Sequence, residues 1–194
     1  MFESHHVSRH FERRCKQTNR QARRKPLQPH ANRRRAKVIK RLPKLSLAVH
    51  AASHLILAAR ASTGGGSDHK HFGPLLSKAQ TRMTLEVALA DAGYDSEANH
   101  CLARQDLKIR SLIPATIGRP GTAPLKGHYR RLMQRRLQAG PDKKCYGQRW
   151  QAETVNSMLK RNLGSACRSR TPRGRKKDML LRTITHNVMI VANL

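Results

Sequence analysis

Positive charge is the feature that most constrains what this chain can fold into. Its 194 residues include 40 Lys or Arg but only 11 Asp or Glu, which gives a formal net charge of +29. Because such charge repels itself in a compact state, we expect the folded form to meet a polyanionic partner. Nucleic acid fits best, since each neutralised phosphate releases counterions and makes binding strong, salt-dependent and largely independent of sequence. The length allows one domain with extensions.

Several other classes of protein are disfavoured. No segment approaches the roughly 18 uninterrupted apolar residues of a membrane-spanning helix, and the start "MFESHHVSRHFERR" lacks the apolar run of a secretory signal. The four cysteines lie far apart without a CxxC pair, which favours reduced thiols in a cytosolic protein over a disulfide framework or a zinc ribbon. The histidines in "HH" and "DHKH" are too local to close a metal site by themselves.

The chain divides near residue 43. Residues 1–43 carry runs of Arg and Lys with almost no apolar periodicity, which predicts a basic arm or loop. Residues 44–194 alternate apolar patterns of strand and helix length, which predicts an α/β domain with a central sheet covered by helices. The first half is expected to form a hairpin from "KLSLAVH" and "HLILAARAS", a helix "HKHFGPLLSKAQ", a strand "TLEVALA", a helix after Asp95 or Ser96 and a strand "LKIRSLIPA". A loop "TIGRPGTAPLKG" follows, and then helices at 128–139 and 146–163. A basic loop "RSRTPRGRKK" leads to a last helix "DMLLRTITHNVMIVANL".

Two acidic residues occupy unusual positions. Asp91 ends a short apolar strand, where side chains of open α/β sheets reach a ligand crevice. Glu153 lies within a basic helix, and at about 100° per residue Tyr146, Arg149, Glu153 and Lys160 fall within about 60° of one another. The apolar residues of that helix face the other way and predict a side packed on the sheet: Ala152, Val155, Met158, Leu159 and Leu163. Taken alone, Arg149 and Glu153 also fit an ordinary surface ion pair worth about 0.2–0.5 kcal/mol.

The spacing Tyr146, Arg149, Glu153, Lys160 resembles the signature helix of bacterial insertion-sequence DDE transposases. "LADAGYDSE", which contains Asp91, looks like the second acidic motif of the same family. The two motifs occur in the family's order. A looser similarity runs through "ESHHVSRHF", "KLSLAV", "HLILAARAS" and "SDHKHFGPLL" to the final "LLRTITHNVMI", so the resemblance covers nearly the whole chain.

The resemblance implies a ribonuclease H-like mixed sheet flanked by helices and a catalytic site in which three carboxylates hold two Mg²⁺ ions. Such a site hydrolyses a DNA strand at the element end, after which the freed 3′-hydroxyl attacks target DNA. Carried over to this chain, Asp91 and Glu153 are the catalytic metal ligands, while Tyr146, Arg149 and Lys160 contact DNA phosphate. The implied partner is double-stranded DNA, with a possible homodimer, in the bacterial cytoplasm at the nucleoid.

This chain departs from the family's pattern at its start. In the family the first acid lies on the opening strand, just upstream of the segment that "ESHHVSRHF" resembles, whereas Glu3 and Glu12 stand in a polar, basic stretch. We therefore expect the domain at 44–194 to be incomplete, to lack its first strand, and to belong to an N-terminally truncated chain that is inactive alone. Asp68 and His50 are weak substitutes, because Asp68 suits a helix cap and imidazole is a poor Mg²⁺ ligand.

Two other hypotheses stay open on the sequence. One is a non-catalytic, basic nucleic-acid-binding protein, for which positive charge suffices, although an aromatic content of 4% disfavours a single-strand stacking platform. The other is a structural, ribosome-associated protein with a basic arm. Metal-dependent cleavage of DNA distinguishes a transposase from both.

Overall fold

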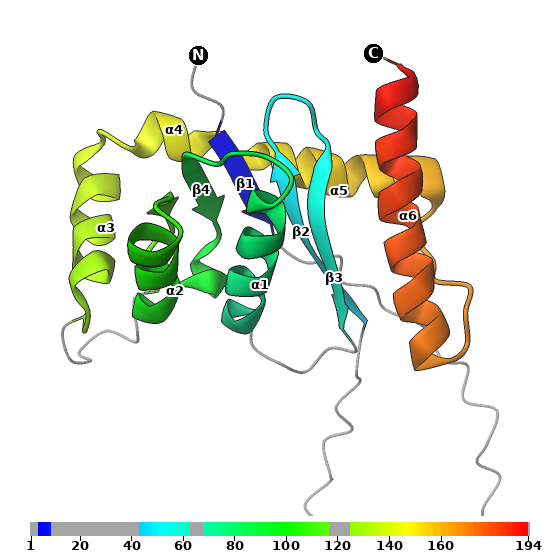
Figure 1. Cartoon of the computed structure of the whole chain (residues 1–194), viewed down its shortest axis with the longest axis horizontal. Helices are drawn as coiled ribbons and strands as arrows, with labels where there is room; N and C mark the ends of the chain where they lie inside the picture. Colours follow the sequence, from blue (N-terminus) through cyan, green and yellow to red (C-terminus); the bar gives the residue numbers. More distant parts are fainter. Residues whose placement is uncertain (1–3, 9–42, 63–67, 117–124, 194) are drawn as a thin grey trace, which may run out of the picture.

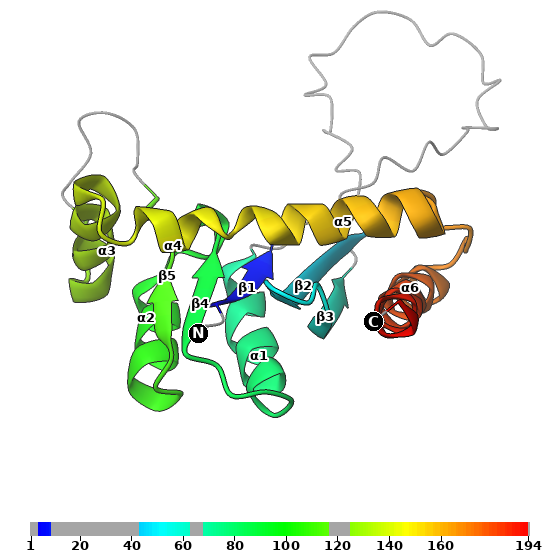
Figure 2. The same ribbon diagram turned by 90° about the horizontal axis from the view of Figure 1, so that it is seen from above.

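The protein is a mixed α/β structure in which helices cover both faces of one sheet (Figures 1 and 2). The computed structural model describes residues 4–8, 43–62, 68–116 and 125–193. Its five-stranded sheet has the order β3-β2-β1-β4-β5. The pairs β3–β2 and β2–β1 are antiparallel, and β1–β4 and β4–β5 are parallel. The strands are β1 Ser4–Ser8, β2 Lys44–His50, β3 Ile56–Ser62, β4 Val87–Ala90 and β5 Arg110–Leu112.

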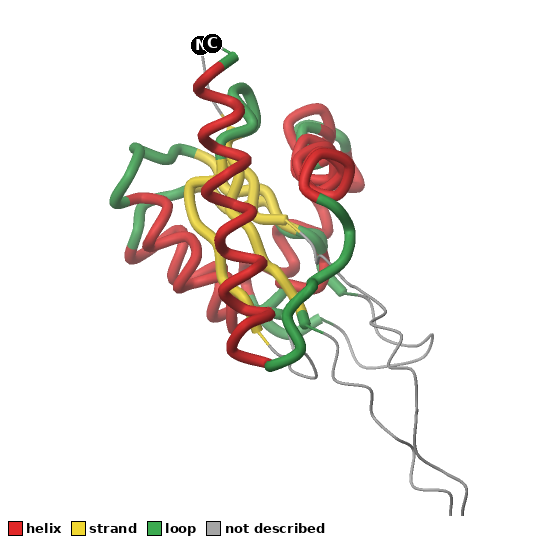
Figure 3. Tube along the Cα trace, turned by 90° about the vertical axis from the view of Figure 1, so that its right-hand side faces the viewer, coloured by secondary structure: helices red, strands yellow, loops and turns green. Residues whose placement is uncertain are grey.

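The helices form a layer on each face and close both ends of the sheet (Figure 2). One face carries α1 and α2, and the other carries α4 and α5, while α3 lies at the β5 end and α6 runs along β3 (Figure 3). Their bounds are α1 His69–Gln80, α2 Glu97–Cys101 with a π-helical turn Leu102–Asp106, α3 His128–Ala139, α4 Lys143–Gly147, α5 Trp150–Leu163 and α6 Pro172–Ala192. None of the described helices is long and apolar enough to span a membrane.

Alternation along β2 builds a core on each face of the sheet. Leu45, Leu47 and Val49 are buried in a cluster with the apolar side of α5, whereas Ala48 belongs to the cluster beneath α1. Period-two alternation has this effect because successive side chains of a strand point to opposite faces. The predicted hairpin, the strand before Asp91 and the helix at 128–139 are all confirmed.

Residues 4–8 correct the expectation of an arm and of a sheet without its first strand. They form β1 in the middle of the sheet, antiparallel to β2 and parallel to β4. "SHHVS" carries no alternating apolar pattern, so the sequence gives no strand signal. A strand with neighbours on both sides is held by backbone hydrogen bonds, which do not depend on that pattern. The rest of the predicted arm, the glycine run at 63–67 and most of the loop after residue 116 lie outside the described residues.

Two helix boundaries also differ from the expectation. The helix expected at 146–163 is divided, because α4 ends at Gly147 and α5 begins at Trp150. The last helix begins at Pro172, well inside the expected basic loop, where the Thr171 hydroxyl accepts a hydrogen bond from the Gly174 backbone N–H at 3.0 Å. A threonine cap followed by proline is a common helix start, because proline has no N–H to leave unsatisfied.

Candidate active site

Asp91 leaves the end of β4 on the side of the sheet that α4 and α5 cover. Val87 and Leu89 lie in the apolar cluster of that side, so Asp91, two residues further, returns to it. Its backbone is extended, with φ −69° and ψ 159°, and its side chain is 8% exposed. The carboxylate thus stands almost buried at the carboxyl end of a parallel strand, where open α/β sheets place ligands.

Arg149 joins the two predicted carboxylates. Its Nη1 atom lies 2.7 Å from Asp91 Oδ1 and 2.7 Å from Glu153 Oε1. Burial lowers the pKa of the Arg149 guanidinium, but the negative charges of Asp91 and Glu153 outweigh burial and leave that pKa raised. The structure therefore brings together Asp91, Arg149 and Glu153 from two segments that are distant in the sequence.

This site opens toward solvent on the side of α5. The Glu153 side chain is 57% exposed and that of Arg149 is 24% exposed, in contrast to the nearly buried Asp91. Glu153 lies in the first turn of α5, where the positive end of the helix dipole favours an acid. A ligand could thus approach from solvent over Glu153 and reach Asp91 at the inner end.

Tyr146 and Lys160 lie on either side of this centre rather than on one continuous helix. Tyr146 belongs to α4 and packs, half-buried, against the apolar cluster of Val87 and Leu89. The Arg149 backbone N–H donates to the Tyr146 carbonyl at 3.0 Å, so the chain keeps turning between the two helices. Lys160 is exposed in the last turn of α5, about two turns beyond Glu153. The prediction of a single helix is therefore wrong, whereas the solvent-facing positions of Glu153 and Lys160 agree with it.

His50 lies away from this centre, whereas Asp68 lies close to Gly93, two residues after Asp91. Asp68 Oδ1 lies 3.6 Å from Lys44 Nζ, and Asp68 stands at the start of α1 without a side-chain capping bond, contrary to the expected cap. In the antiparallel register of β1 and β2, Leu47 lies opposite Ser8, at the carboxyl end of β1. His50 lies opposite His5, near the start of β1. Because β1 and β4 are parallel, the carboxyl end of β1 is also at the edge where Asp91 stands. His50 is at the other edge, where its Nδ1 and the Ser53 hydroxyl form a 2.6 Å hydrogen bond.

The donor atoms suit a hard divalent cation in part. Asp91 Oδ1 and Glu153 Oε1 are carboxylate oxygens, the ligands that Mg²⁺ prefers, and both approach the same point, which the Arg149 nitrogen occupies. They lie no further apart than twice 2.7 Å. The described part of the chain contains no group of three or more His, Cys, Asp or Glu side chains placed to hold a metal. The site therefore offers two ligands, together with a cation that must move before a metal can take its place.

The segment after Asp91 is fixed by a polar network that the sequence does not reveal. The Tyr94 backbone N–H donates to the Asp91 carbonyl at 2.9 Å. Asp95 accepts 2.7 Å hydrogen bonds from the Thr116 backbone N–H and from Arg130 Nη2. Burial raises the pKa of the Tyr94 hydroxyl well above its ordinary value, because the phenolate is disfavoured away from water. These contacts hold the carboxyl end of β4 and hence the position of Asp91.

Asn156, about one turn beyond Glu153 on α5, is a buried polar residue that the sequence-based prediction did not single out. It is 7% exposed, although it is polar and belongs to the buried side of α5. At about 100° per residue, Asn156 lies between two faces of α5: the face of Arg149 and Glu153, and the apolar face of Ala152 and Leu159. That placement was available from the sequence, as a polar residue at the border between the acidic side and the apolar side.

The fold and this centre define a basic, mixed α/β protein that presents two carboxylates and an arginine at the carboxyl end of a parallel strand. A family model described as the transposase DDE domain matches residues 4–188, and because this match spans nearly the whole chain, the protein belongs to that family. The family acts on DNA and generally uses a divalent metal. Neither a curated protein nor a solved structure matched the chain.

Proposed function

We propose that this protein is the catalytic domain of an insertion-sequence transposase, which cleaves DNA at element ends and joins them to target DNA with Mg²⁺. The observation that supports this proposal best is the meeting of Asp91 and Glu153 at one nitrogen of Arg149. A ribonuclease H-like fold is supported by the mixed sheet, in which antiparallel pairs precede parallel ones and helices lie on both faces. Its place of action would be DNA in the bacterial cytoplasm.

Asp91 and Glu153 would hold the divalent ion, which would supply Lewis-acid polarisation of a phosphoryl oxygen of the DNA. Mg²⁺ in proteins usually keeps several waters and binds one or two carboxylates together with phosphate oxygens. The two carboxylates at this point of the described structure match that coordination for a single ion. The exposed side of Glu153 leaves room for the phosphate.

Arg149 would have two successive partners. Without DNA it neutralises two carboxylates that otherwise repel each other. With an ion held by those carboxylates, the guanidinium would turn to a DNA phosphate, which its planar fork would bind through two hydrogen bonds. Lys160, exposed further along α5, would contact the same strand as a point charge, and the Tyr146 hydroxyl would complete the set of phosphate contacts.

We expect this 194-residue chain to bind DNA far better than it cuts it. Two-metal displacement requires ions about 3.5–4 Å apart, held by a bridging carboxylate as well as by terminal ones. Among the described residues, Asp91 and Glu153 provide ligands for one weakly held ion.

Metal binding and DNA nicking test this proposal together. Nuclease-treated protein would be titrated with Mn²⁺ and followed by electron paramagnetic resonance, and then mixed with supercoiled plasmid. Asp91→Asn and Glu153→Gln are the test variants. Glu86→Gln is the matched control, because Glu86 is an exposed acid just before the other end of β4.

The unchanged chain and the control should bind Mn²⁺, both site variants should lose it, and all four proteins should still bind DNA. Plasmid nicking, if present, should follow Mn²⁺ binding. Equal Mn²⁺ binding in all four proteins would refute the assignment of the ligands. DNA binding by an unchanged chain that takes up no Mn²⁺ would support the alternative, a non-catalytic basic nucleic-acid-binding protein.

A further inference from the structure

Arg149 is the cation beside a nearly buried carboxylate. The Asp91 side chain is 8% exposed, and its Oδ1 atom lies 2.7 Å from Arg149 Nη1. Removing the cation from such a pair leaves a charge that has lost most of its hydration, which makes the separation strongly unfavourable. Arg149 therefore leaves Asp91 readily only when another cation replaces it.

The same position cannot hold Arg149 and a divalent ion together. Arg149 Nη1 also lies 2.7 Å from Glu153 Oε1, so the point between the two carboxylate oxygens is filled by a positive charge. Although burial opposes it, the negative charges of Asp91 and Glu153 leave the pKa of Arg149 raised, and the side chain cannot make room by losing its proton. Two cations at such short range repel each other strongly. Arg149 must move away as a cation before an ion can bind there.

The Arg149 side chain can move toward solvent. Arg149 is 24% exposed and Glu153 is 57% exposed, so the side chain does not have to cross the protein core. A guanidinium that leaves a carboxylate needs another anion, and DNA phosphate matches its planar fork through two hydrogen bonds. The formal net charge of +29 draws DNA to the surface of the chain. A phosphate on the solvent side of Glu153 is thus the natural second partner of Arg149.

The local charges balance only if the ion and the phosphate arrive together. The two carboxylates and the guanidinium leave one negative charge in excess. An ion that arrives while Arg149 stays adds two positive charges at the same point, and Arg149 that leaves alone exposes the carboxylates to each other. With Arg149 on a phosphate and a divalent ion on Asp91 and Glu153, the formal charges cancel.

We propose that Arg149 couples the binding of DNA to the binding of the divalent ion, so that each raises the affinity for the other. This inference rests on the proposed function, since it takes Asp91 and Glu153 as the ligands of the ion. DNA and the ion both favour the outward position of one side chain, and two ligands that favour the same state bind cooperatively, by an equal factor in each direction. The free protein thereby holds the ion weakly, and metal-dependent chemistry is confined to protein that already holds DNA.

Mn²⁺ titration followed by electron paramagnetic resonance, with and without a short DNA duplex, measures the coupling. The Mn²⁺ that the duplex takes up alone is subtracted. For the unchanged chain, the duplex should raise the affinity for Mn²⁺ at least about tenfold, within the range usual for coupled sites. Without DNA, Arg149→Gln should bind Mn²⁺ about tenfold more tightly than the unchanged chain, because no cation has to leave. The duplex should raise the affinity of this variant far less.

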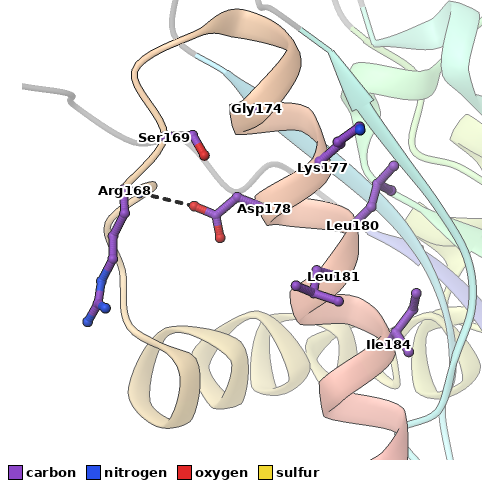
Figure 4. A pocket seen from close by; sticks show the side chains of 8 residues that line it. All are labelled: Arg168, Ser169, Gly174, Lys177, Asp178, Leu180, Leu181 and Ile184. Carbon is purple, nitrogen blue, oxygen red and sulfur yellow. Dashed lines mark hydrogen bonds between the residues drawn. The ribbon is translucent and has the colours of Figure 1, made fainter.

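Arg168→Gln is the matched control, because it removes one guanidinium elsewhere. Arg168 borders a hollow between the loop before α6 and α6 itself, and its exposed side chain points away from that helix (Figure 4). Its contact with Asp178 Oδ2, at 3.0 Å, is made by the backbone N–H, which glutamine retains. The residues that line the hollow do not include Asp91 or Glu153. The control should therefore show the same coupling as the unchanged chain.

DNA affinity gives the reverse measurement. At constant ionic strength, fluorescence anisotropy of a labelled duplex should show that Mn²⁺ tightens DNA binding by the unchanged chain and by the control. The factor should equal the one by which DNA tightens Mn²⁺ binding. Arg149→Gln and Asp91→Asn should show no such gain, because divalent ions otherwise compete with basic side chains for phosphate. The sign of the response thus distinguishes coupling from ordinary competition.

The outcomes separate the coupling from the proposed ligands. If Arg149→Gln binds Mn²⁺ no more tightly than the unchanged chain without DNA, while Asp91→Asn loses Mn²⁺, the ligands stand and the coupling is wrong. If Asp91→Asn binds Mn²⁺ as the unchanged chain does, or no protein takes up Mn²⁺, the proposed function fails and the coupling with it. Far-UV circular dichroism checks that the variants fold. Should Arg149→Gln not fold, the unchanged chain decides alone: a gain in DNA affinity with Mn²⁺ supports the coupling, and a loss overturns it.

Discussion

Replacement of Arg149 by glutamine removes the cation that joins the two carboxylates while keeping a polar side chain. The contact with Asp91 should account for most of the lost stability, because that carboxylate is only 8% exposed. A hydrogen bond to a charged group contributes about 1.5–3 kcal/mol. Glu153 is 57% exposed, so its contact with Arg149 adds no more than about 0.5 kcal/mol. We therefore expect Arg149→Gln to lower the free energy of unfolding by about 2–3 kcal/mol.

Divalent metal should reverse this loss in the variant more than it stabilises the unchanged protein. Without Arg149 the two carboxylates face each other with no cation between them, so an ion can bind there without displacing a side chain. A ligand at 100 times its dissociation constant stabilises the folded state by about 2.7 kcal/mol, which is enough to offset the mutation. In the unchanged protein the ion must first break the Arg149 contacts, so the same Mg²⁺ concentration should stabilise it less.

Urea unfolding followed by circular dichroism, with and without millimolar Mg²⁺ or Mn²⁺, measures both effects. Arg135→Gln is the matched control, because Arg135 is exposed on α3 and the charge change is the same. The control should lose little stability and respond to metal as the unchanged protein does. The account of the site is refuted if Arg149→Gln is as stable as the control, or if metal stabilises all three proteins equally.

Three further predictions concern packing, DNA binding and pH. Leu159 is 2% exposed and packs against the sheet, so Leu159→Ala should lower the free energy of unfolding in urea by about 2–5 kcal/mol. Lys160 is exposed, so Lys160→Ala should change stability by less than about 0.5 kcal/mol while weakening DNA binding in a filter assay. Equal losses of stability would mean that the faces of α5 are misassigned. Duplex DNA affinity, measured by fluorescence anisotropy, should fall by about 10³–10⁵ between roughly 50 and 200 mM salt if six to ten phosphates are contacted, and affinity that ignores salt would contradict an electrostatic interface. Burial lowers the pKa of His100 from 6.5 to about 4, so on acidification the unfolded chain takes up a proton before the folded one does. The free energy of unfolding should therefore fall by up to about 3 kcal/mol as the pH drops from about 6.5 to about 4. His100→Gln should flatten that part of the pH profile.

Much of the fold follows from apolar periodicity. The alternation in "KLSLAVH" identifies β2 because one set of its side chains packs under α5 and the other under α1. On α5 the same reasoning correctly buries Val155 and Leu159 and exposes Glu153. These elements each bury a regular face, so their local pattern and their tertiary environment agree.

The remaining elements depend on interactions that local patterns do not contain. β1 is defined by pairing with strands on both sides, not by its own side chains. The division between α4 and α5 falls at Gly147, and the start of α6 at Thr171 and Pro172 is hidden by the surrounding arginines. Both of these boundaries have known signals, a glycine near a helix end and a threonine cap before proline, which the basic composition outweighed.

The site shows the same limit in a single residue. Four-residue spacing predicts the pair of Arg149 with Glu153, and that contact exists, but spacing cannot predict that the same nitrogen also reaches Asp91. The contact between Arg149 and Asp91 depends on the apolar side of α5. Ala152, Val155 and Leu159 pack on β2 and β3, and this packing orients α5 so that its first turn lies near the end of β4. Because one residue corresponds to about 100° of rotation, a shift of α5 by a single position would move Glu153 away from Asp91. The carboxylate pair therefore depends as much on the buried leucine and valine of α5 as on the acids themselves, and it is this packing that turns an ordinary surface ion pair into a candidate metal centre.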